Sequence, residues 1–265
     1  MIIAKKSLGQ NFLTNRGIVD KIIQAAEILP TDFILEVGPG TGILTREIAK
    51  RAKKVLAVEK DRRLIADLEK EFSGTNIQIA EGDILDFDIR NYLGFGISDL
   101  EFPNYKIIGN LPYYITSHFI RTVFEEWPQP SLMILMVQKE VAKRIVARPP
   151  EMNLLALSVQ YYAKPEIITY VSRGSFRPAP TVDSAVIKLT PRAEYFLIAE
   201  KEELFFSILK SAFGGKRKQL INTLPTIISK NKQGTAELLT QIGISPQTRP
   251  ETVDLAHWLI LVNSL

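Results

Sequence analysis

The chain has 265 residues, of which 46% are hydrophobic and 23% are charged, and it contains 15 glycines and 15 prolines. This length suits one large or two unequal domains, and the composition is that of a globular protein rather than a disordered or fibrous one. There is no cysteine and there are only two histidines. Disulfide scaffolds, cysteine nucleophiles and thiolate zinc sites are therefore excluded, and histidine-based triads and metal sites are disfavoured.

The net charge is +4, which permits a polyanionic partner such as nucleic acid without demanding one. No apolar run reaches the length of a membrane span, and the first residues lack the apolar stretch of a signal peptide. We therefore expect a cytoplasmic protein with no membrane partner.

Hydrophobic periodicity predicts an amphipathic helix over about residues 16–28, which Pro30 ends. Strands then alternate with helices, which is typical of a parallel, doubly wound sheet. The predicted strands are residues 33–37, 54–58, 77–80, 105–108 and 132–137, and the predicted helices are residues 41–51, 61–72, 116–126 and 139–147.

The second half of the chain changes character. We expect a helix at residues 153–163, and then an antiparallel pair of edge strands at residues 167–171 and 185–189, joined by an irregular loop rich in proline and glycine. Beyond Pro191 only helical patterns remain, at about residues 200–213, 215–223, 234–242 and 251–262. The sequence thus predicts an α/β domain of residues 1–192 and a small all-helical domain of residues 193–265.

A glycine-rich turn, Glu36-Val-Gly-Pro-Gly-Thr-Gly42, lies where the strand at residues 33–37 becomes a helix. Glycines at 38, 40 and 42 let the backbone turn tightly and approach a ligand closely. Position 43 is Ile43, so the G-x-G-x-x-G pattern of dinucleotide binding is not met, and no P-loop pattern is present. The turn could simply connect two elements, but the acidic Glu36 before the glycines favours a ligand that carries an ammonium group.

Two further carboxylates follow neighbouring strands. Glu59 ends the strand at residues 54–58 and could accept both hydroxyls of a ribose, as the corresponding acid does in nucleotide-binding folds. Alternatively, Glu59 favours the dipole of the next helix. Asp83 follows the third strand, at the edge where open α/β sheets bind ligands.

The motif Asn110-Leu-Pro-Tyr113 directly follows the fourth strand. The side-chain oxygen of Asn110 and the carbonyl of Leu111 can accept hydrogen bonds from an amine, and Tyr113 offers a ring on which a planar base can stack. Pro112 stiffens the turn. A weakly nucleophilic exocyclic amine needs such acceptors to be alkylated, and it needs no strong base, because its proton can leave to water afterwards.

Together, these motifs resemble the bacterial small-subunit (16S) rRNA adenine N6,N6-dimethyltransferase family, and the similarity runs from about residue 5 to residue 262. The matching segments are residues 6–13, 36–42, 81–83, 110–113, 176–184, 213–220 and 243–251. The resemblance implies a Rossmann-like class I methyltransferase sheet, S-adenosylmethionine as the methyl donor, S-adenosylhomocysteine as the product, and adenosines near the 3′ end of 16S rRNA as acceptors. It implies no metal, and we expect a monomer that takes part in small-subunit maturation.

The resemblance also assigns residues. The donor-binding residues that it implies are Gln10, Asn11, Leu13, Glu36, Gly38, Gly40, Gly42, Glu59, Asp83, Ile84 and Asn110. Asn110, Leu111 and Pro112 form the expected acceptor turn, and Tyr113 and Phe176 are expected to sandwich a flipped-out adenine. Phe176 could instead fill the core between the edge strands.

Basic residues on two predicted helices are candidates for contacts with RNA phosphates. They are Lys139, Lys143, Arg144, Lys216, Arg217 and Lys218. Such residues are often only solvated surface charges, and the helix around Lys216 is poorer in arginine than the family pattern.

Other functions remain open at this point. Asn-x-Pro-Tyr chemistry specifies only an amine on a planar base, so a large-subunit rRNA or DNA adenine methyltransferase is one alternative. An RNA-binding assembly factor for the small ribosomal subunit, with methylation secondary, is another.

Overall fold

In the computed structural model, the described residues are 4–5, 8–92, 105–192, 197–215 and 218–265. The chain divides into two compact units. The first comprises Met1–Ala142 and Lys164–Pro191, and the second comprises Lys143–Ala163 and Arg192–Leu265.

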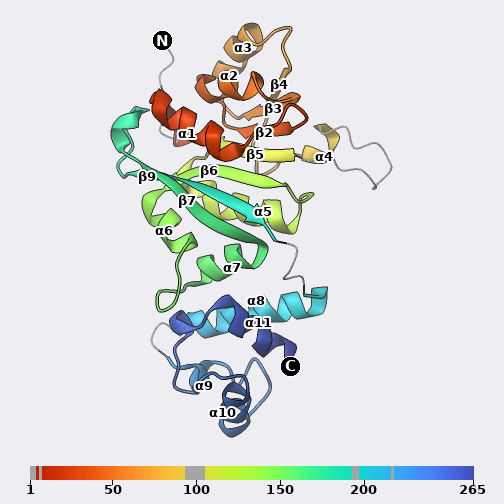
Figure 1. Ribbon diagram of the computed structural model, residues 1–265, viewed down its shortest axis with the longest axis vertical. Coiled ribbons are helices and arrows are strands. Elements are labelled where there is room, and N and C mark those ends of the chain that lie inside the picture. The colour runs from red at the N-terminus through yellow and green to blue at the C-terminus, as the bar shows by residue number, and fades with distance from the viewer. Residues whose placement is uncertain (1–3, 6–7, 93–104, 193–196, 216–217) are drawn as a thin grey trace. The chain divides into compact units, whose positions relative to one another are not determined.

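The first unit contains a seven-stranded sheet in the order β4-β3-β2-β5-β6-β9-β7 (Figure 1). The pairs β2–β3, β2–β5, β3–β4 and β5–β6 are parallel, whereas β9 pairs antiparallel with β6. The strands are β2 (Phe33–Val37), β3 (Lys54–Glu59), β4 (Ile77–Glu81), β5 (Tyr105–Asn110), β6 (Leu132–Gln138), β7 (Ala163–Val171) and β9 (Ser184–Pro191). The predicted parallel sheet is confirmed, with strand ends shifted by a few residues.

The strands become more apolar toward the centre of the sheet. All residues of β6 except the last are buried, whereas β4 and β7 at the two edges keep several exposed side chains. Central strands are covered on both faces and therefore need continuous apolar runs, while edge strands do not.

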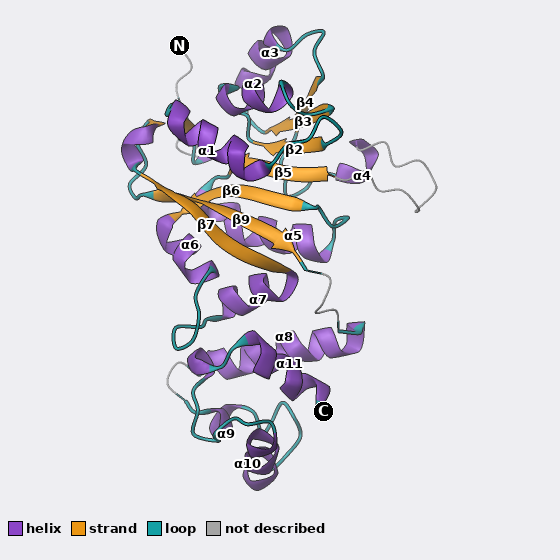
Figure 2. Cartoon of the chain, in the orientation of Figure 1, coloured by secondary structure: helices purple, strands orange, loops and turns teal. Residues whose placement is uncertain are grey.

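Helices cover the sheet, as the α/β pattern predicts (Figure 2). They are α1 (Arg16–Ala26), α2 (Ile43–Ala49), α3 (Arg62–Glu71), α4 (Ile89–Tyr92), α5 (Thr116–Glu125) and α6 (Lys139–Ile145), which continues into the second unit. The amphipathic α1 and α2 share one hydrophobic cluster with Ile34, Ile108 and Ile134 of the strands. Leu35, Ile107 and Met133 are the chain neighbours of these three isoleucines and therefore point to the opposite face of the sheet. They are also buried, so that face is covered as well.

A small second sheet, which the sequence did not predict, joins the N-terminal segment to the loop before β9. The strands β1 (Phe12–Leu13) and β8 (Phe176–Arg177) pair antiparallel, with Leu13 opposite Phe176. The loop between β7 and β9 is therefore not wholly irregular, because part of it is held by the N-terminal segment.

The described residues of the second unit form helices and connecting loops, apart from the first residue of β7, in agreement with the helical pattern predicted beyond Pro191. Its helices are α7 (Leu154–Tyr162), α8 (Ala199–Gly214), α9 (Leu220–Thr223), α10 (Lys232–Gln241) and α11 (Leu255–Asn263). The expected boundary at residue 193 leaves out α7, which belongs here: Tyr161 stacks on Phe205 of α8 at 4.9 Å, and the Tyr162 hydroxyl donates to Glu202 at 2.6 Å.

A buried ion pair fixes the end of α1 beside the sheet. Lys106 Nζ lies 2.8 Å from Asp32 Oδ2, and both side chains are buried. The same ammonium donates to the carbonyl of Ala26, the last residue of α1, at 3.1 Å and to that of Glu27, its C-cap, at 2.6 Å. Lys106 thus satisfies orphan carbonyls of a helix end and a buried carboxylate together.

Replacing Lys106 with methionine is expected to lower the free energy of unfolding by about 3 kcal/mol, because the change leaves the Asp32 carboxylate buried without its partner. Urea unfolding followed by circular dichroism measures this loss.

Lys188→Met is the matched control. Lys188 pairs with Glu27 at 2.6 Å, but the Glu27 side chain is largely exposed, so the control is expected to cost less than about 1 kcal/mol. Equal losses in the two variants would contradict the assignment of Lys106 as a buried structural clamp.

Candidate functional site

The carboxyl ends of four parallel strands meet at one edge of the sheet. Val37 of β2 lies beside Val58 of β3 on one side and Gly109 of β5 on the other, and Glu59 of β3 lies beside Glu81 of β4. From β2, the chain first adds β3 and β4 on one side and then adds β5 and β6 on the other side. Open α/β sheets form their ligand crevice at such a switch point, here between β2 and β5. A cavity opens there, lined by residues 8–13, 36–41, 43–44, 58–60, 82–84 and 110–115.

Most of the residues singled out from the sequence come together in this cavity. They are Gln10, Asn11, Leu13, Glu36, Gly38, Gly40, Glu59, Asp83, Ile84, Asn110, Leu111, Pro112 and Tyr113. Gly42 and Phe176 are not among the lining residues. Gly42 begins α2 with a positive φ of 75°, and a Cβ there would meet the Phe72 ring at 3.1 Å, so this glycine serves the backbone turn and its packing.

Gly40 shows why the turn needs glycine. Its φ is +58°, and a Cβ would lie 3.0 Å from the Phe12 ring. Its N–H donates to Glu59 Oε2 at 3.2 Å. Gly40 thus contacts the N-terminal segment on one side and Glu59, the acid that ends β3, on the other. A larger residue at this position would clash with Phe12.

Glu36 is a buried carboxylate whose Oε2 has no hydrogen-bond partner in the part of the chain that is described. Burial raises the pKa of Glu36 to about 8; Thr45 opposes part of this rise and the charge of Glu59 adds to it. A buried acid in this state is costly when ionised. The site is therefore built to receive a cation or a hydrogen-bond donor.

Glu59 is also buried, but its carboxylate is partly satisfied. Besides Gly40, the N–H of Asp61 donates to Glu59 Oε1 at 2.8 Å. Burial raises the pKa of Glu59, and these backbone N–H groups oppose the rise. A carboxylate accepts about four hydrogen bonds, and the N–H groups of Asp61, Gly40 and Lys60 take three of them, so Glu59 keeps capacity for a ligand hydroxyl.

Asp83 does not stand alone at the third strand end, because Lys60 pairs with it. Burial works against ionisation, but the hydrogen bond and charge of Lys60 lower the pKa of Asp83 on balance. Asp83 Oδ1 accepts from the N–H of Leu85 at 3.2 Å. Lys60 was not singled out from the sequence, although its place directly after Glu59, at a strand end, was the available signal.

The acceptor turn after β5 is held from two directions. The Asn110 side-chain amide donates to the carbonyl of Asn11 at 3.0 Å, which fixes the carboxamide and leaves its oxygen to accept. The Tyr113 hydroxyl shares a 2.7 Å hydrogen bond with Ser184 Oγ. Tyr114 also lines the cavity and is 65% exposed. It was not predicted as a site residue, although it directly follows the Asn110–Tyr113 motif.

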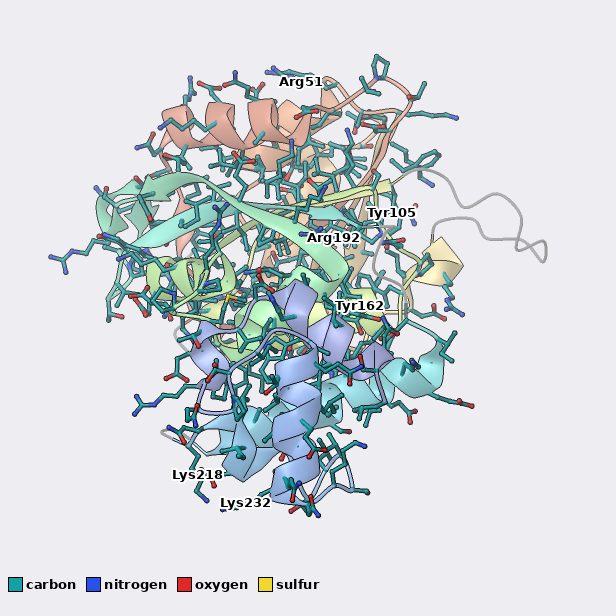
Figure 3. All side chains as sticks on the ribbon, turned by 60° about the horizontal axis from the view of Figure 1, so that its bottom comes forward. Arg51, Tyr105, Tyr162, Arg192, Lys218 and Lys232 are labelled. Atoms are coloured by element: carbon teal, nitrogen blue, oxygen red, sulfur yellow. The ribbon has the colours of Figure 1, made fainter. Side chains whose placement is uncertain are left out.

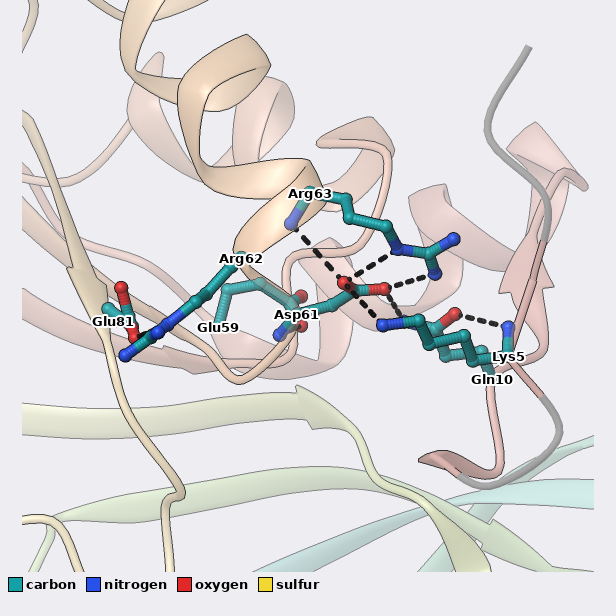
Figure 4. Close-up of polar contacts among 7 residues, drawn as sticks. All are labelled: Lys5, Gln10, Glu59, Asp61, Arg62, Arg63 and Glu81. Carbon is teal, nitrogen blue, oxygen red and sulfur yellow. Dashed lines mark hydrogen bonds and ion pairs between the residues drawn. The ribbon is translucent and has the colours of Figure 1, made fainter.

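The N-terminal segment is tied across the cavity through Asp61 (Figure 4). Gln10 Nε2 donates to Asp61 Oδ2 at 2.8 Å, and Gln10 Oε1 accepts from the N–H of Lys5 at 2.8 Å. Arg63 also pairs with Asp61, and this pairing holds the pKa of Asp61 well below its usual range despite burial. The Gln10 carboxamide thus holds the segment in place, a role that the sequence did not reveal.

Phe176 requires a correction. Its side chain is 1% exposed and belongs to the hydrophobic cluster that includes Leu13, Val19 and Val171. A base cannot stack on a ring buried in this way, so the structure places Phe176 in the core, the alternative named above.

The predicted RNA-contacting residues are spread over both units. Lys139 begins α6, and Lys143 and Arg144 are exposed on the same helix. Lys218 is exposed in the second unit, as is Lys232 (Figure 3). Lys216 and Arg217 lie outside the described residues.

The sequence model of the ribosomal RNA adenine dimethylase family matches residues 2–265. The chain belongs to this family. Two relatives named ribosomal RNA small subunit methyltransferase A support the assignment. The protein from Dehalococcoides mccartyi (strain ATCC BAA-2266 / KCTC 15142 / 195) is 42% identical over 259 residues, 97% of this chain and 87% of the relative. The protein from Pelotomaculum thermopropionicum is 40% identical and covers 99% of this chain and 92% of its own.

Solved structures agree with this membership. A dimethyladenosine transferase from Plasmodium falciparum superposes with a TM-score of 0.80 at 28% identity, covering 96% of each chain. The 23S rRNA methyltransferase ErmE superposes with a TM-score of 0.78 at 29% identity, covering 96% of this chain and 99% of its own. The fold is thus the Rossmann-like methyltransferase fold with a helical C-terminal region, and the protein is a methyltransferase that uses S-adenosylmethionine.

In the part of the chain that the structure describes, no group of three or more histidines, aspartates or glutamates could hold a metal ion, and no helix is long and apolar enough to cross a membrane.

The burial of Glu36 predicts a pH-dependent stability. Because its pKa rises from 4.5 to about 8 on folding, the folded protein keeps a proton that the unfolded chain loses, and stability falls as pH rises through this range. Glu36→Gln, which mimics the protonated acid, is expected to gain about 3 kcal/mol of unfolding free energy relative to wild type between pH 5 and pH 8. Urea unfolding at the two pH values measures the difference.

Glu81→Gln is the matched control, since Glu81 ends the neighbouring strand but is exposed and paired with Arg62. Its stability difference from wild type should not change over this pH range. A pH-independent effect of Glu36→Gln would show that the Glu36 carboxyl is ionised throughout.

Proposed function

We propose that this protein transfers methyl groups from S-adenosylmethionine to the N6 atoms of adenosines near the 3′ end of 16S rRNA, forming N6,N6-dimethyladenosine during small-subunit maturation. The observation that carries the proposal is the Asn110 turn, whose carboxamide is fixed by Asn11 and lies in the same cavity as the buried Glu36. The names of relatives about 40% identical over nearly the whole chain support the small ribosomal subunit as the target.

The cavity fits the donor. Glu36 offers a buried oxygen without a partner, which suits the ammonium group of a methionine moiety. Glu59 has two oxygens for a ribose, and the Gly38–Gly40 turn leaves room that a Cβ would fill. Asp83 and Ile84 would hold the adenine ring. When bound, the donor supplies an electrophilic methyl group on a sulfonium centre.

The acceptor side is arranged for an amine. Asn110 Oδ1 and the Leu111 carbonyl would accept the N–H groups of the target adenine and so aim the nitrogen lone pair at the methyl group. Tyr113 would support the base with its ring. After the first transfer one N–H remains to be held by the same acceptors, so a second methyl can follow, and each released proton passes to water.

We also propose roles for the two units, a location and an oligomeric state. The first unit is the donor-binding domain, and the helical unit contributes RNA contacts through exposed lysines such as Lys218. The protein is proposed to act as a cytoplasmic monomer without a metal ion.

A second candidate is methylation of large-subunit rRNA, favoured by the similarity to ErmE over 96% of the chain. A third hypothesis is an RNA-binding assembly factor whose methylation is secondary. The ribosomal subunit that is methylated distinguishes the first two, and methyltransferase activity itself distinguishes both from the third.

One experiment distinguishes them. The purified protein is incubated with labelled S-adenosylmethionine and either small or large ribosomal subunits that lack the modification, and the labelled nucleosides are identified by mass spectrometry. N6,N6-dimethyladenosine confined to small-subunit RNA is the expected result. Label in large-subunit RNA would favour the second candidate, and tight subunit binding without label would favour the assembly factor.

Asn110→Ala and Glu59→Ala are expected to separate the two halves of the site. Asn110→Ala should slow methyl transfer about 100-fold, because the amine is no longer aligned, and leave the donor Kd within about threefold. Glu59→Ala should mainly raise the donor Kd. Single-turnover rates and calorimetric titration with the donor measure the two effects, and wild-type transfer rates in Asn110→Ala would contradict the proposed acceptor role.

A further inference from the structure

A tyrosine and a lysine form an exposed pair on the surface beside the acceptor turn. Tyr170 lies near the end of the edge strand β7 and is 51% exposed. The Nζ atom of Lys139, the first residue of α6, lies 5.3 Å from the centroid of the Tyr170 ring. We refer to these two residues as the Tyr170–Lys139 pair.

The pair is linked to the acceptor turn by a short series of contacts. Tyr113 bonds to Ser184, the first residue of β9, and Ser184 lies opposite Gln138 at the end of β6. The N–H of Lys139 then donates to the carbonyl of Asp183 at 3.0 Å. The Tyr170–Lys139 pair thus lies at the same edge of the sheet as Asn110, outside the donor cavity.

Packing does not account for the position of Tyr170. The next residue, Val171, is buried in the hydrophobic cluster of the first unit, whereas the Tyr170 side chain points to the other side of the strand and leaves about half of its surface in solvent. Lys139 is similarly available: its ion pair with Asp183 is 3.7 Å long, and both side chains are more than 40% exposed. Exposed pairs of this kind contribute little stability and exchange readily for another anion.

An exposed aromatic ring with a cation beside it is the arrangement that binds single-stranded nucleic acid without base specificity. The ring stacks on a base, and the cation contacts a phosphate. An enzyme that extracts one base from its stack leaves the neighbouring nucleotide without a stacking partner, and a second aromatic surface compensates for that loss.

We propose that the Tyr170–Lys139 pair is a subsite for the nucleotide adjacent to the target adenosine, with its base on the Tyr170 ring and its phosphate on Lys139. The inference rests on the proposed function, since it concerns the RNA that enters the same site. Tyr114 is also exposed, but it lines the donor cavity and belongs to the target site itself.

The test compares Tyr170→Ala, Tyr170→Phe and Tyr170→Trp with wild type, using unmethylated small subunits as substrate. Tyr170→Ala is expected to raise KM for the subunits about tenfold, the loss of one stacked base, while the donor Kd and the thermal midpoint stay unchanged. The Phe and Trp variants keep a ring and are expected to stay within about twofold of wild type. Leu29→Ala is the matched control, because Leu29 is similarly exposed at 54% but precedes β2, at the opposite edge of the sheet.

Lys139→Met tests the other half of the subsite. It is expected to weaken subunit binding and to reduce its dependence on salt concentration, because one phosphate contact is lost. If wild type methylates the subunits and Tyr170→Ala does so with unchanged KM, the subsite is refuted and the proposed function stands. Equal losses in Tyr170→Ala and Tyr170→Phe would also refute it, because the ring would then not be the contact. A wild-type protein that binds donor and transfers no methyl group would refute the proposed function itself.

Discussion

The unpaired oxygen of the buried Glu36 is the constraint on which the donor site depends. An acid in this position costs free energy whenever it is ionised, and no cation among the described residues offsets that cost. The surrounding groups do not relieve it: Glu59 is a second acid nearby, and Lys60 is engaged with Asp83. The missing compensation must come from a ligand, so a cationic group gains affinity there that a neutral analogue does not.

The N-terminal segment joins the two halves of the site. The Asn11 carbonyl fixes Asn110 on the proposed acceptor side, while Gln10 is bound to Asp61 beside Glu59, the acid proposed to bind the donor ribose. One residue further, β1 pairs with β8 in the loop that precedes β9. A displacement of this short segment would therefore change the contacts of Asp61, of the Asn110 amide and of the loop before β9 together.

The sequence was sufficient for features set by local pattern. Alternating apolar runs located the strands, and the rule that ligands bind at carboxyl ends brought Glu36, Glu59 and Asn110 into one cavity. The sequence was insufficient where the structure depends on pairing between two segments that are far apart in the chain. Leu13 and Phe176 are far apart in the chain, and nothing in either segment specifies their pairing, so the sequence left both a stacking role and a core position open for Phe176.

The same limit explains α7. Its apolar pattern correctly predicted a helix, but it did not show that α8 is the partner of this helix. Tyr161 stacks on Phe205 of α8, and the hydroxyls of Tyr161 and Tyr162 donate to Glu202 of the same helix. Lys60 and Tyr114 were missed for a different reason. Each directly follows a residue whose role was recognised, and a role assigned to one residue says nothing about how its neighbour is oriented.

The reversal of one strand decides which side of the site can accept a large substrate. Parallel strands are joined by helices that cross over the sheet, and the loops that lead into these helices line the cavity at residues 36–41, 58–60 and 82–84. Because β9 runs antiparallel to β6, the catalytic edge on that side receives a loop and the exposed ends of β7 and α6. The proposed donor is a small molecule that fits a cavity, whereas the proposed RNA substrate needs an exposed surface with rings and cations. A single antiparallel strand thus places the cavity and an exposed surface at the same edge of the sheet.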